Sequence, residues 1–77
     1  MNVEKVCELV AKALEIDTDL IRSDSSAETV EIWDSLGQIS ILAQLDEQFQ
    51  NVTEQCPELA SAVSVAEIQK ILTDAGY

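Results

Sequence analysis

The chain has 77 residues, of which 47% are apolar, and its 15 acidic and 4 basic side chains give a formal net charge of −11. This charge excludes nucleic acid as a partner, because the phosphates would be repelled, and it disfavours anionic membranes. The apolar fraction argues against disorder, no apolar run is long enough to span a bilayer, and the start MNVEKVCELV lacks the features of a signal peptide. We therefore expect one small, monomeric, cytoplasmic domain whose acidic surface either meets basic docking patches or simply confers solubility.

The first predicted element is an amphipathic helix from Asn2, its expected cap, to about Ile16. Its apolar residues recur at helical spacing, at Val3, Val6, Cys7, Val10 and Leu14. The following segment, residues 17–34, is rich in Ser, Asp and Thr, and its VEIW run has no second strand with which to pair. We predict a long loop there, of a kind that is often functional, pinned to the core by Leu20, Ile21, Val30 and Ile32.

The second predicted helix runs from Ser35 to Gln48 or Phe49. Ser35 and Gln38 form an S-x-x-Q capping box, in which Ser35 would be the N-cap. The apolar arc of this helix is wide: one stripe, expected to face the core, contains Ile41, Leu42, Leu45 and Phe49, and beside it lie Leu36, Ile39 and Ala43. Either the helix is central in a bundle, or some apolar residues stay outside for a partner. Gly37 costs up to about 1 kcal/mol relative to alanine and is expected to loosen the helix start.

The last third of the chain contains a predicted polar loop and two predicted helices. The loop covers residues 50–55, and a short helix follows in PELASA, with Pro57 in its first turn. Ser64 and Glu67 then form a second capping box, which opens a final helix that Gly76 ends. The predicted fold is all-α: residues 1–77 form a single domain, a bundle of three main helices plus one short helix, with a long loop between the first two helices.

Ser35 is the residue whose role needs an explanation, since it can be a cap, a nucleophile or an attachment point. A nucleophilic serine needs a base nearby, but the chain has no histidine, and its basic residues are scattered in sequence, at Lys5, Lys12, Arg22 and Lys70. We therefore predict that the chain is not an enzyme. A hydroxyl at a helix start suits a covalently attached phosphate, because free N–H groups and the helix dipole favour an anion there.

The remaining residues suggest no metal site and no disulfide. The run Asp17-Thr18-Asp19 begins like an EF-hand calcium loop, but Ile21 and Arg22 then stand where a ligand and a glycine are needed. Cys7 and Cys56 are expected to stay unpaired in a cytoplasmic chain, and no cysteine–histidine cluster suggests zinc. The interpretation that fits the residues best is a modified serine on a carrier or on an interaction module.

The pattern around Ser35 resembles that of the acyl carrier proteins over essentially the whole chain. The matching residues are Asp34-Ser35-Leu36, followed by Ile39, Ile41-Leu42, Leu45, Asp46-Glu47 and Phe49. This resemblance implies that Ser35, flanked by the motif residues Asp34 and Leu36, carries 4′-phosphopantetheine, added from coenzyme A by a phosphopantetheinyl transferase. The arm would hold acyl or aminoacyl groups as thioesters, and Leu36, Leu42, Leu45, Ile68 and Leu72 would line a cavity for them or simply form the core.

The chain departs from the fatty-acid-synthesis members of that family at four positions, namely Ile32, Trp33, Gly37 and Ser40. We therefore expect a specialised stand-alone carrier, in polyketide, lipid, saccharide or aminoacyl modification. Its loading, condensing or transferring enzymes would dock on an apolar patch with an acidic border, formed by Ile39, Ala43, Asp46 and Glu47. The alternative is an acidic helical interaction module that never carries a prosthetic group.

Overall fold

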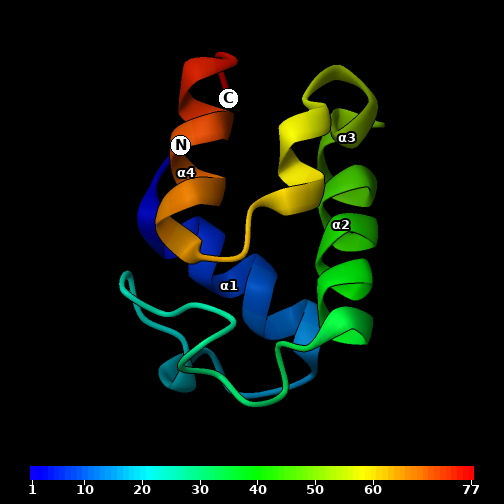
Figure 1. Cartoon of the computed structure of the whole chain (residues 1–77). Coiled ribbons are helices and arrows are strands. Elements are labelled where there is room, and N and C mark those ends of the chain that lie inside the picture. Colours follow the sequence, from blue (N-terminus) through cyan, green and yellow to red (C-terminus); the bar gives the residue numbers. More distant parts are fainter.

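The computed structural model describes all 77 residues, and Figure 1 shows that they form a helical bundle. The α-helices are α1 (Val3–Leu14), α2 (Ser35–Phe49), the short α3 (Val52–Gln55) and α4 (Val65–Asp74), and the 3-10 turns are η1 (Thr18–Leu20) and η2 (Pro57–Ser61). There is no β-strand, and a long loop joins α1 to α2. The predicted all-α class is confirmed. No helix has the length and apolar character that a membrane crossing would require.

Helix α1 has the ends that its sequence predicts. The side chain of Asn2 accepts a hydrogen bond from the Glu4 N–H at 2.7 Å, which satisfies one of the free donors of the first turn. At the other end Glu15 adopts a left-handed conformation, with φ of 58°, and its N–H closes the helix on carbonyls of the last turn. The apolar stripe of α1 is buried against α2 and α4.

Helix α2 buries only part of its wide apolar arc. Ile41 and Leu45 are fully buried, and Leu42 and Phe49 are partly buried and pack against the same core, as predicted for this stripe. The neighbouring residues are outside: Leu36 is 75% exposed and Ile39 is 63% exposed. Some apolar side chains of this helix therefore remain uncovered, which is the exposure that the second interpretation requires.

The long loop is held by two of the four residues predicted to anchor it, and by Trp33. Ile21 is buried and Val30 packs on the core, but Leu20 and Ile32 are exposed, so the prediction was wrong for these two. The indole of Trp33 is the main anchor, since it is only 2% exposed and offers a large apolar area. A backbone bridge between Ser26 and Ser64 ties the loop to the segment before α4.

The segment between α2 and α4 departs from the sequence prediction at one place. Residues 52–55 form α3, where a polar loop was expected. Asp46 of α2 explains this difference, because its carboxylate accepts hydrogen bonds from the N–H and the hydroxyl of Thr53, both at 2.8 Å. The short helix predicted in PELASA is the 3-10 turn η2, with Pro57 in its first turn.

Helix α4 begins and ends close to its predicted limits. Ser64 caps it, accepting from the Glu67 N–H at 3.1 Å and donating its hydroxyl to the Glu67 carboxylate. Gly76, with φ of +92°, follows its last turn. The Met1 ammonium is fastened to this helix, since it donates to Thr73 at 3.0 Å, and the Tyr77 ring at the other chain end packs on Phe49 of α2.

Candidate functional site

The start of α2 differs from the predicted capping box. Asp34, not Ser35, is the N-cap, and its Oδ1 atom accepts a hydrogen bond from the Gly37 N–H at 2.9 Å. The prediction that Ser35 caps the helix was therefore wrong. Both residue types cap well, and the backbone of Asp34 is the one that is extended here. Ser35 becomes the first residue of the helix, exposed, with a hydroxyl that bonds to no protein group.

Two backbone donors beside this hydroxyl are also free. The N–H groups of Ser35 and Leu36 have no hydrogen-bond partner within the protein, whereas those of Gly37 and Gln38 are satisfied by Asp34. Unpaired N–H groups in a first helical turn point along the helix axis, and together with the helix dipole they favour an anion. The site therefore combines an accessible hydroxyl with a local preference for negative charge.

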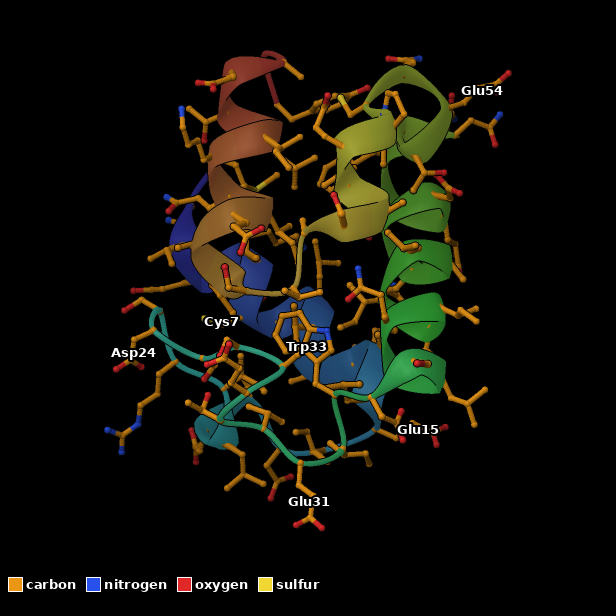
Figure 2. The ribbon with its side chains drawn as sticks, in the orientation of Figure 1. Cys7, Glu15, Asp24, Glu31, Trp33 and Glu54 are labelled. Carbon is orange, nitrogen blue, oxygen red and sulfur yellow. The ribbon has the colours of Figure 1, made fainter.

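Gln38 has a different function from that of the predicted capping partner. Its Oε1 atom accepts a hydrogen bond from the indole Nε1 of Trp33 at 2.7 Å. Its amide nitrogen lies 3.0 Å from the carbonyl oxygen of Ala62 and 3.4 Å from those of Leu59 and Ala60. Figure 2 shows Trp33 between the long loop and the bundle, with the indole nitrogen directed toward α2. This network joins the loop, α2 and the end of η2 directly beside Ser35.

Gly37 is required by packing, which sequence reasoning missed. A Cβ atom on this residue would lie 2.6 Å from the Ile32 carbonyl oxygen and 2.9 Å from Cδ2 of Leu14. The expectation that Gly37 merely loosens the helix start is therefore corrected. The missing side chain lets the loop backbone approach α2, and this approach sets the position of the turn that carries Ser35.

Exposed apolar side chains surround Ser35. Leu36 is 75% exposed, Ile39 63%, Ile32 48% and Val63 41%. An open groove of about 460 Å³ runs past the hydroxyl, lined by Ala27, Trp33, Asp34, Ser35, Gln38, Ile39 and Val63. A second open hollow, between the end of α1 and the start of α2, is lined in part by Ile32 and Leu36. The serine thus stands on a partly apolar surface that the rest of the chain leaves uncovered.

The residues predicted to bind partners do not all have the same surroundings. Ile39, Ala43 and Glu47 are exposed on α2. Asp46 is only partly exposed, and both of its carboxylate oxygens bind Thr53 at the start of α3. The structure therefore gives Asp46 a role in the fold that the sequence did not indicate, because the contact depends on a residue seven positions along the chain.

The predicted cavity residues form core, except at one position. Leu45, Ile68 and Leu72 are at most 1% exposed, Leu42 is partly buried, and no hollow of the protein is lined by any of these four. Leu36 points to solvent, so its assignment to an interior cavity was wrong.

The two cysteines are free thiols in the interior. Burial raises the pKa of the Cys7 thiol, and the nearby negative charge of Glu4 raises this pKa further. A thiol that holds its proton in this way is a weak nucleophile at neutral pH. No group of three or more histidine, cysteine or carboxylate side chains is arranged to hold a metal ion.

Comparison with known proteins adds no relative. The chain matches no family model, no curated protein and no solved structure.

Proposed function

We propose that this chain is a non-catalytic acyl carrier whose Ser35 bears 4′-phosphopantetheine through a phosphodiester bond. The observation that carries the proposal is the exposed, unbonded Ser35 hydroxyl in the first turn of α2, next to two free N–H donors. An anionic phosphodiester fits this position, because the donors and the helix dipole both favour negative charge. The Asp34-Ser35-Leu36 motif and its offsets along α2 support the same assignment.

The chain's own residues would present the arm and perform no chemistry. When bound, the arm supplies a terminal thiol that holds an acyl or aminoacyl group as a thioester. Asp34 caps the helix on which the arm stands, and Gly37 lets the preceding loop pack closely against it. Trp33 and Gln38 fasten that loop to α2, which supports the helix start on which the arm would stand. A phosphopantetheinyl transferase would supply the base that takes the proton from Ser35.

The enzymes that load, extend or transfer the cargo would dock on α2. Ile39 and Ala43 offer an exposed apolar contact, and Glu47 adds charge at the border of this patch. With a net charge of −11 the chain would meet basic docking patches quickly through electrostatic steering. In this proposal the carrier is a cytoplasmic, stand-alone monomer. It serves a specialised pathway, since residues 32, 33, 37 and 40 depart from the fatty-acid-synthesis pattern.

The test is to incubate the protein with coenzyme A, magnesium and a broad-specificity phosphopantetheinyl transferase, and to measure its intact mass. We expect one phosphopantetheinyl group on the wild type and none on Ser35→Ala. Ser40→Ala is the matched control, since it removes another exposed hydroxyl one turn further along α2 and leaves Ser35 in place. An unmodified wild type, with a known carrier modified in the same tube, would refute the assignment.

The second candidate is an acidic interaction module without a prosthetic group. The observation that favours it is the exposure of the apolar side chains of Leu36, Ile39 and Val63, which need no arm to contact a partner. The same mass measurement separates the two candidates, because a module of this kind would stay unmodified.

A further inference from the structure

The seam between α2 and η2 is closed, close to Ser35, by one side chain. Gln38 lies three residues after Ser35, and its amide nitrogen reaches the carbonyl oxygens of Leu59, Ala60 and Ala62. Its amide oxygen accepts the indole N–H of Trp33 at 2.7 Å. One glutamine therefore joins the loop, α2 and η2 at the groove that Ser35 itself lines, where a group attached to Ser35 would meet the bundle.

Opening this seam would break several hydrogen bonds at once, including the one made by the buried indole N–H of Trp33. Trp33 is 2% exposed, so its N–H would lose its only partner without gaining water. The chain contains no buried polar side-chain atom without a partner, and an entering alkyl chain would create at least one. An apolar chain cannot replace the bonds that it would break.

The interior behind the seam is also filled. Leu45, Leu59 and Leu72 are fully buried, Ile68 is 1% exposed, and none of them lines a hollow. A long acyl chain would have to displace packed side chains as well as the glutamine. The hollow that does adjoin Ser35 is the outer groove beside Ile39 and Val63, which is open to solvent.

We infer that Gln38 is a specificity-determining residue that keeps the cargo on Ser35 outside the bundle. This inference rests on the proposed carrier function. It assigns to the chain short or polar acyl and aminoacyl groups, which need no shelter from water, and it excludes sequestration of a long alkyl chain among the helices. The cargo would stay accessible to partner enzymes throughout.

The test attaches the cargo without any transferase, so its failure is distinct from failure of the proposed function. In Ser35→Cys, the new exposed thiol adds across the double bond of N-octylmaleimide or N-ethylmaleimide, forming a thioether. Wild type under the same native conditions controls for reaction at the buried Cys7 and Cys56. The melting temperature is then compared between the octyl and ethyl adducts, together with the amide NMR signals of core residues such as Leu45 and Leu72.

We expect equal melting temperatures for the two adducts in Ser35→Cys, and unshifted core signals. In Ser35→Cys with Gln38→Ala, the octyl adduct is expected to melt roughly 4 °C or more above the ethyl adduct, because the opened seam admits the chain. Gln44→Ala is the matched control on the same helix and should behave as the parent.

Two results would overturn the inference. An octyl adduct of Ser35→Cys that already melts higher than the ethyl adduct, with shifted core signals, would mean that the native seam opens. If the octyl and ethyl adducts have equal melting temperatures both in Ser35→Cys and in Ser35→Cys with Gln38→Ala, Gln38 does not control entry of the chain. If Gln38→Ala fails to fold, Trp33→Phe takes its place, since it removes the indole N–H that holds the glutamine and keeps an aromatic ring in the core.

Discussion

Replacing Gly37 by alanine is the sharpest test of the packing at the attachment site. Ordinary helix propensity predicts stabilisation, because alanine is favoured over glycine by about 1 kcal/mol inside a helix. The structure predicts the opposite. The added Cβ would lie 2.6 Å from the Ile32 carbonyl oxygen, closer than the 3.0 Å below which real Cβ contacts essentially never occur.

The contact cannot be relieved by a side-chain rotation, since the oxygen belongs to the backbone. Moving the Ile32 carbonyl also moves Trp33, whose ring is buried and whose N–H binds Gln38. The second contact, at 2.9 Å, is with the Leu14 side chain, which is itself 4% exposed. Overpacking of this kind costs about 1–3 kcal/mol. After the propensity gain, we expect a net loss of about 1 kcal/mol, or a fall in melting temperature of roughly 4–8 °C.

The assay is urea unfolding followed by tryptophan fluorescence, since the single Trp33 reports directly on this junction. Ala43→Gly is the matched control, because it exchanges alanine and glycine at an exposed position of α2. It should lower the free energy of unfolding by about 1 kcal/mol through helix propensity alone. If Gly37→Ala raised the free energy of unfolding by the amount that Ala43→Gly lowers it, the steric argument would be wrong.

Four further outcomes follow from the same contacts. Asp34→Ala should lower the free energy of unfolding by about 1 kcal/mol through loss of the helix cap, as measured by urea unfolding. Asp34→Asn should keep nearly the wild-type stability, because asparagine also caps helices well. Asp46→Ala should destabilise by about 1–2 kcal/mol because it frees the start of α3, whereas Glu47→Ala should leave the melting temperature unchanged. Ile39→Ala should weaken transferase binding by about 1–2 kcal/mol with little change in melting temperature, and a sharp loss of stability instead would mean that the residue is core. Stability should fall as pH rises above about 9, because the unfolded chain ionises Cys7 near its ordinary pKa of 9.0 while the folded chain keeps the proton; Cys7→Ala should flatten this part of a pH series of melting curves.

Periodicity and capping residues were sufficient to predict the three main helices, because these signals are local. The limits of α1 and α4 depend on Asn2 and Ser64, which cap their own first turns. The same local signal gave the limits of α2 correctly but misassigned its cap, since an aspartate and a serine stand side by side there and propensity cannot choose between them. Helix α3 was missed because Asp46 stabilises it from the preceding helix.

The exposed serine of the candidate site could be predicted from the sequence, but the residues that hold it in place could not. The bond network of Gln38 depends on carbonyls more than 20 residues away, and the need for Gly37 depends on a backbone oxygen of the loop. Neither relation has a sequence period. For the same reason Leu20 and Ile32 were wrongly expected to be buried. Both side chains are exposed, and the large buried side chain of the loop is Trp33.

The anchoring of both chain ends beside α4 has a practical consequence for handling the protein. Met1 is bound to Thr73 and Gln69, and Tyr77 donates its hydroxyl to Gln55. Figure 1 shows both ends near one another, at the far end of the bundle from the start of α2. A peptide tag or surface linker at either end would therefore leave from the face opposite Ser35. Protein immobilised in this way would present the serine outward, and its encounters with soluble enzymes could be timed without steric interference from the support.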